Sequence, residues 1–126
     1  MVILASQRAG WSLEVIGEYF NGNEKANIFP KTTGEMLELS HFHLFTIPLM
    51  LLVQGHIFVM SSFPKKHAVK VVGLSYLSGA LYIASPWLII YGGASLAIAG
   101  LLGRSFLVIT LFIMTIFPLV DMWKHK

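Results

Sequence analysis

The segment SHFHLFTIPLMLLVQGHIF, residues 40–58, decides what kind of protein this chain forms. Its side chains are almost all apolar, and it contains no Asp, Glu, Lys or Arg. An α-helix of about 20 such residues crosses the ~30 Å hydrocarbon core of a bilayer. We therefore predict that this segment lies in a membrane-spanning helix.

The same pattern extends over most of the 126-residue chain, which is 56% hydrophobic and only 12% charged. A soluble domain carries roughly twice that charged fraction. Residues 39–64 contain no charged side chain, and Arg104 is the only one between Lys70 and Asp121. We predict an all-α integral membrane helical bundle with about three transmembrane helices, at residues 39–63, 71–91 and 94–123.

Residues 1–38 have a different composition, with most of the acidic side chains of the chain, an Asn-Gly pair and a proline. We predict that they form a short polar cap, and that residues 39–126 form the transmembrane domain. Lysines concentrate in the turn at residues 65–70 and in the tail, on one side of a three-span arrangement. Because cytoplasmic loops are rich in Lys and Arg, we expect a cytoplasmic C-terminus and an extracytoplasmic cap. An outside N-terminus requires either that a short tail is translocated or that a preceding helix is missing from this chain.

Several classes of function are excluded by composition. The chain has no cysteine, which rules out disulfides, thiolate metal sites and covalent c-type haem attachment. Its excess of basic residues lies in the loops that flank the spans, so it indicates membrane topology rather than nucleic-acid binding. Because the sequence contains no nucleophilic triad, phosphate loop or intramembrane carboxylate pair, we do not expect the chain to be an enzyme.

The first span contains three of the five histidines, His41, His43 and His56. Imidazole is costly in a bilayer unless it is paired, and neutral imidazole is the usual axial ligand of b-type haem in membranes. At about 100° and 1.5 Å per residue, His41 and His56 share a face and lie ~22 Å apart along the axis. His43 points about 140° away from His56. We predict that these three histidines are the candidate ligands of haem iron.

One copy of the chain cannot complete two bis-histidine haems, because the second and third predicted spans contain no histidine. Met50, Met60 and Met114 are possible sixth ligands, although a methionine in a membrane helix is usually a packing residue. We therefore expect further ligands from a homodimer partner or from other membrane subunits.

The histidines also allow other interpretations. His41 and His43 resemble a metal-binding pair, but side chains two residues apart on a helix point in different directions. A (bacterio)chlorophyll pigment needs only one axial histidine. His41 can instead form an interfacial hydrogen bond, and Gln54 or water can satisfy His56. In that case the chain is a structural accessory subunit that binds only lipid and its neighbours.

Arg104 is the fourth candidate site residue, predicted near the outer boundary of the hydrocarbon. Its long stem allows the guanidinium to reach the headgroup region by snorkelling. Alternatively it forms an ion pair with a haem propionate or with a carboxylate such as Glu35 or Glu38.

The acidic segment, the Ser40-His41-x-His43 motif at the start of the first span, and the stretch LYIASPWLIIYGGA at residues 81–94 resemble a family of small bacterial inner-membrane proteins. The resemblance covers nearly the whole chain and implies a multi-pass protein of the bacterial inner membrane. Members of that family accompany electron-transfer proteins. The resemblance supports location and fold more than function. With the three histidines as candidate ligands, we favour a subunit of a respiratory or photosynthetic complex that binds or flanks haem b. The acids Glu14, Glu18 and Glu24 would then attract a basic soluble cytochrome.

Overall fold

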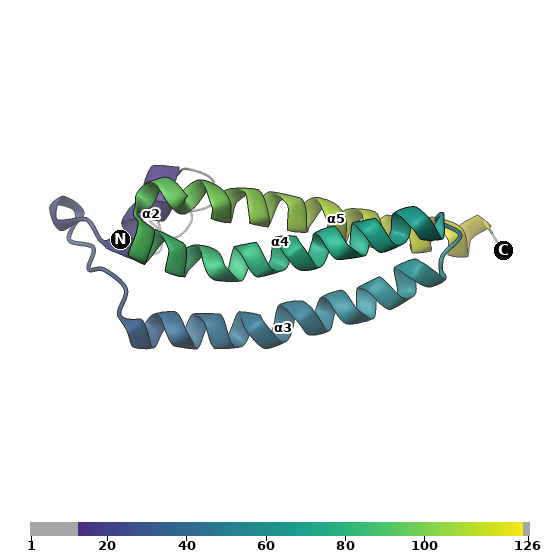
Figure 1. Ribbon diagram of the computed structural model, residues 1–126, viewed down its shortest axis with the longest axis horizontal. Coiled ribbons are helices and arrows are strands. Elements are labelled where there is room, and N and C mark those ends of the chain that lie inside the picture. Colours follow the sequence, from purple (N-terminus) through teal and green to yellow (C-terminus); the bar gives the residue numbers. More distant parts are fainter. Residues whose placement is uncertain (1–12, 125–126) are drawn as a thin grey trace.

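The structure is a computed structural model that describes residues 13–124. Three long helices dominate it (Figure 1): α3 (Thr33–Met60), α4 (Lys65–Gly92) and α5 (Ala97–Lys124). The short helix α2 (Leu13–Asn21) and the 3-10 turns η1 (Glu24–Ala26) and η2 (Ala94–Leu96) complete it, and the described residues form no β-strand. The predicted all-α architecture is confirmed. A helix before residue 1 would lie outside the described residues.

Each long helix has 28 residues, which corresponds to about 42 Å at 1.5 Å per residue. All three are long and apolar enough to cross a membrane. They run alternately up and down, so the α3–α4 turn and the C-terminal end lie together at one end, and α2 lies at the other (Figure 1). The chain is therefore a multi-pass membrane protein, as predicted.

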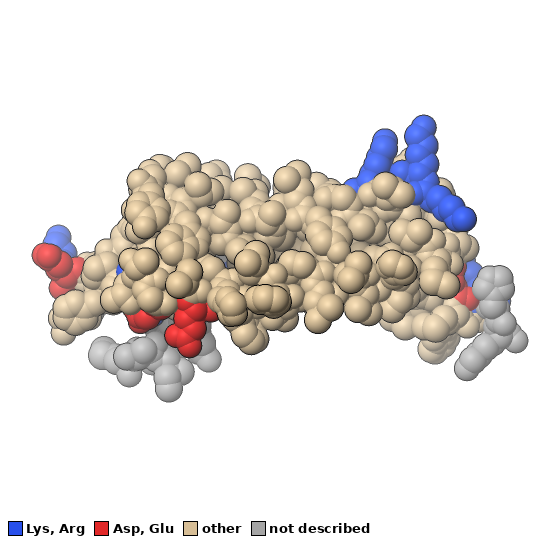
Figure 2. All heavy atoms as spheres, turned by 60° about the horizontal axis from the view of Figure 1, so that its bottom comes forward, with Lys and Arg blue, Asp and Glu red and all other residues tan. Residues whose placement is uncertain are grey.

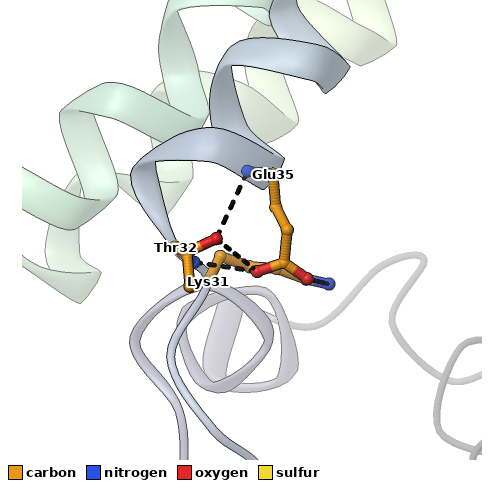
Figure 3. A network of polar contacts seen from close by, with 3 residues as sticks. All are labelled: Lys31, Thr32 and Glu35. Atoms are coloured by element: carbon orange, nitrogen blue, oxygen red, sulfur yellow. Dashed lines mark hydrogen bonds and ion pairs between the residues drawn. The ribbon is translucent and has the colours of Figure 1, made fainter.

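The helix α3 begins six residues before the predicted span, because a capping box starts it at Thr33. The Thr32 hydroxyl accepts a hydrogen bond from the Glu35 backbone N–H, and the Glu35 carboxylate accepts one from the Thr32 N–H at 2.9 Å (Figure 3). Lys31 adds an ion pair to Glu35 at 3.3 Å. The T-x-x-E pattern that specifies this start is present in the sequence.

The helix α4 also begins earlier than the predicted span, at Lys65 directly after Pro64. The backbone carbonyl of Pro64 accepts hydrogen bonds from the N–H groups of His67 and Ala68. The lysine-rich segment thus forms the first two turns of a helix rather than a loop. The helix ends at Gly92, and Gly93 has a φ of 95°, which a glycine adopts without steric cost.

Small residues bring the helices together. A Cβ added to Gly103 of α5 would lie 2.9 Å from the Tyr82 backbone nitrogen of α4. A Cβ on Gly79 of α4 would lie 3.1 Å from a methyl group of Ile47 on α3. The absence of these methyl groups lets the backbones approach closely, which is how membrane helices gain packing contacts.

Two apolar clusters form the core between the helices. Ile47, Leu51 and Leu107 pack together in one, and Phe58, Ala68 and Met114 in the other. Figure 2 shows charged side chains at the two ends of the molecule and an uncharged surface between them on the visible face. This separation is what a membrane-spanning bundle requires, because charged side chains are costly in the hydrocarbon.

Candidate functional site

A cavity of about 250 Å³ lies at the α2 end of the bundle, where α2 packs against α4 and α5. It brings together two of the four predicted site residues, His43 and Arg104. Aromatic and apolar side chains make up most of the rest of its wall, with a few hydroxyl groups among them. Besides His43 and Arg104, the lining consists of Ile16, Tyr19, Phe20, Leu39, Ser40, Tyr82, Ile83, Ser85, Pro86, Gly100 and Leu101.

The hydrogen bonding of His43 fixes which of its ring nitrogens carries the proton when the ring is neutral. Its Nδ1 lies 2.8 Å from the Leu39 carbonyl oxygen. Since a carbonyl oxygen only accepts, Nδ1 donates, and Nε2 is left with a lone pair. The ring also packs edge-on against Tyr82, with centroids 5.7 Å apart. This is a fixed, half-buried imidazole whose Nε2 can accept a hydrogen bond or bind a metal ion.

Contacts between α3, α4 and α5 shape the cavity. The Trp87 indole N–H of α4 donates to the Ser40 hydroxyl of α3 at 2.7 Å. On the other side, the Ser85 hydroxyl donates to the Tyr82 carbonyl at 2.8 Å. A Cβ on Gly100 of α5 would lie 2.6 Å from the Ser85 oxygen. The glycine therefore allows α5 to form this part of the wall.

Arg104 lies in the second turn of α5 and is half-buried against the cavity. Glu35, one of its two predicted carboxylate partners, pairs with Lys31 in the capping box. Arg104 lies near the end of the bundle at which α2 packs, and its depth in the membrane stays a prediction. Its contact with a haem propionate stays a prediction.

His41 and His56 lie elsewhere, on the outside of the bundle. Both side chains are exposed. The His41 ring contacts Phe45 of its own helix, with centroids 5.1 Å apart. Neither imidazole ring forms a hydrogen bond within the part of the chain that the structure describes. The bundle thus separates His43 from the other two predicted ligands.

Gln54, considered above as a partner for His56, reaches across the bundle instead. Its Nε2 donates to the Thr115 hydroxyl of α5 at 2.5 Å. Of the possible methionine ligands, Met114 is buried in the core, whereas Met60 is exposed. Across residues 13–124, no three His, Cys, Asp or Glu side chains gather in a way that could hold a metal ion.

Sequence reasoning missed most of the cavity wall, including Tyr19, Ser40 and Tyr82. The rings of Trp87 and Tyr91, near the end of the second span, stack with their centroids 6.2 Å apart and an interplanar angle of 11°. The aromatic side chains near the end of the second span were the available signal. Which of them turn toward α3 depends on how the helices pack.

In comparisons with known proteins, no curated protein and no solved structure matches the chain. A protein-family comparison does match, over residues 10–126, which is most of the sequence. The matching family, Aq_1264_TM, is described as a transmembrane helical domain. That description agrees with the three membrane-crossing helices. The chain belongs to this family of transmembrane helical domains.

Proposed function

We propose that the chain is a small membrane subunit of an electron-transfer complex, in which His41 and His56 bind b-type haem at a contact with a neighbouring subunit. The observation that carries the proposal is the exposure of both imidazoles on the outside of α3. A polar side chain within a membrane span nearly always faces protein or a water-filled cavity. A partner that covers this side of α3 would remove both rings from lipid.

Haem is the ligand class that best matches these residues. Neutral imidazole is its usual axial ligand, and the chain offers no cysteine for other haem or metal chemistry. The two histidines are about 22 Å apart along the helix, which would place one haem toward each membrane surface. That arrangement suits electron transfer across a bilayer.

The cavity beside His43 is too small for this role. Its volume of about 250 Å³ is smaller than the roughly 300–1,000 Å³ of pockets that hold drug-sized ligands. Haem is at least as large as a drug-sized ligand, so it does not fit. Haem therefore requires the open side of α3. Because one copy offers a single histidine near each membrane surface, the second axial ligand of each haem comes from another copy or subunit. In a symmetric dimer, His56 would face its own copy.

The resemblance to small bacterial inner-membrane proteins supports a location in that membrane, and the lysine distribution supports an orientation with the lysine-rich end in the cytoplasm. Lys65, Lys66 and Lys70 follow the α3–α4 turn, at the same end as Lys124 (Figure 1). The α2 end would then face outward with Glu18 and Glu24, and could attract a basic soluble cytochrome. The side chain of Glu14 lies outside the described residues.

A visible spectrum of the chain, purified from bacterial membranes in mild detergent, tests the proposal. We expect a reduced α-band typical of b-type haem. Because His41 and His56 are exposed, His41→Ala and His56→Ala should leave the bundle folded and weaken the band. The control is His67→Ala, an exposed histidine in the first turn of α4.

A colourless, folded protein would favour the structural accessory role, and a chlorophyll-like spectrum would favour pigment binding. Native mass spectrometry in the same detergent adds a check on the partner. A monomer that retains haem would contradict the requirement for a second subunit.

A further inference from the structure

We infer that the cavity beside His43 binds the headgroup of a membrane-soluble hydroquinone, with the His43 Nε2 accepting a hydrogen bond from a ring hydroxyl. This goes beyond the proposed function and does not depend on it, since it uses the cavity rather than the open side of α3.

The route to the cavity favours an amphipathic ligand. Three of the four helices that line it span the membrane, and the fourth, α2, packs against α4 and α5 at the end. The lining residues on α3, from Leu39 to His43, lie about 10–15 Å along that helix from its start. A ligand with a lipid-soluble tail can place a small headgroup at this depth. A volume of about 250 Å³ admits one ring system but no macrocycle.

The hydrogen-bonding groups require a ligand that donates. Nδ1 of His43 is committed to the Leu39 carbonyl, so Nε2 can only accept while the ring is neutral. A phosphodiester or a carboxylate can accept from Arg104, which also lines the cavity, but it brings only acceptors and leaves the His43 Nε2 unsatisfied. An aromatic hydroxyl provides the missing proton.

The Ser40 hydroxyl is a second group that can bind the same hydroxyl of the ligand. The Ser40 oxygen accepts from the Trp87 indole, which leaves the serine proton to be donated. Ser40 and His43 are three residues apart on α3, so their side chains lie on neighbouring parts of one face. One ligand hydroxyl can therefore donate to His43 and accept from Ser40.

The wall selects a flat ring over an aliphatic alcohol. Tyr19 and Phe20 of α2 face the cavity together with Tyr82 of α4. Aromatic rings favour stacked or edge-to-face contacts with another ring, beyond the area that they bury. A hydroquinone combines such a ring with donor hydroxyls and an apolar tail.

The test compares a decyl-tailed benzoquinol with its oxidised quinone, by anoxic titration calorimetry on the full chain in detergent. The two ligands share a ring and a tail, but the quinone cannot donate. We expect the wild-type protein to bind the quinol about tenfold more tightly, which corresponds to one hydrogen bond. His43→Phe keeps an aromatic ring beside Tyr82 and should abolish the preference.

His41→Phe is the matched control, because it makes the same change on an exposed side of α3 and should retain the tenfold preference. Leu101→Trp fills the cavity from α5 and should weaken the binding of both ligands, with circular dichroism as the check of folding. The inference is overturned if wild type shows no saturable quinol binding, if His43→Phe keeps the preference, or if Leu101→Trp binds as wild type does. Since the haem proposal rests on His41 and His56, it stands or fails separately in the visible spectrum.

Discussion

The carboxylate of Asp121 accepts two hydrogen bonds from Ser62, one from the backbone N–H and one from the hydroxyl. Ser62 lies in the turn between α3 and α4, and Asp121 lies in the last turn of α5. The two residues are 59 positions apart in the sequence and meet at the lysine-rich end of the bundle. This contact fixes the turn against the third helix and explains why a carboxylate occurs so near the end of a membrane span.

We predict that Ser62→Ala lowers the free energy of unfolding by about 1 kcal/mol, because the hydroxyl bond to the carboxylate is lost. Unfolding in a titration from mild detergent into sodium dodecyl sulfate, followed by circular dichroism, measures the change. The control is Thr46→Ala, since the Thr46 hydroxyl donates only to the Phe42 carbonyl of its own helix. Equal losses in the two variants would contradict a specific role for the interhelical bond.

Close packing between α4 and α5 gives a second prediction. Gly103→Ala places a methyl group 2.9 Å from the Tyr82 nitrogen and 3.1 Å from the Ser78 oxygen, both of which are backbone atoms. We expect a loss of about 1–3 kcal/mol in the free energy of unfolding, because the helices must move apart. Gly73→Ala, whose methyl group would meet nothing within 4 Å, should cost nothing. The same detergent titration compares the two, and a tolerated Gly103→Ala would refute the close contact.

The orientation in the membrane can be tested by labelling, because the chain has no native cysteine. Glu24 and Lys66 are exposed at opposite ends of the bundle. We expect Glu24→Cys to react with a membrane-impermeant maleimide in intact cells with a permeabilised outer membrane. Lys66→Cys should react only after the inner membrane is opened. The reverse pattern would invert the proposed topology.

The capping box at the start of α3 predicts a local effect. Thr32→Ala removes the hydroxyl that accepts from the Glu35 N–H, so the first turn should open more readily. Hydrogen–deuterium exchange should become faster for the amides of residues 33–36 and stay unchanged beyond them. Thr33→Ala, a change at the next exposed residue, is the control. Exchange that is unchanged in Thr32→Ala would show that the cap does not hold the helix start.

The sequence alone determined the number and approximate position of the long helices. Residues 39–64 lack charged side chains. Such a segment forms a helix in a bilayer, because the helix pairs its own backbone N–H and C=O groups where no water is present. Two helix starts also have local signals in the sequence: the T-x-x-E pattern that begins at Thr32, and Pro64 directly before α4. Both helices begin earlier than the spans that hydropathy alone predicts. Local rules of hydrogen bonding were sufficient for these features.

Tertiary structure decided which side of each helix faces the bundle. In a soluble helix the polar side chains mark the outward face, but α3 is apolar almost all around, so its sequence carries no such mark. His41 and His43 are chemically identical and two residues apart, yet one is exposed and the other lines a cavity with Arg104. The difference comes from the contacts of α3 with α4, where Trp87 meets Ser40 and Tyr82 meets His43. Such contacts depend on side-chain shape across distant segments, and spacing along one helix cannot specify them.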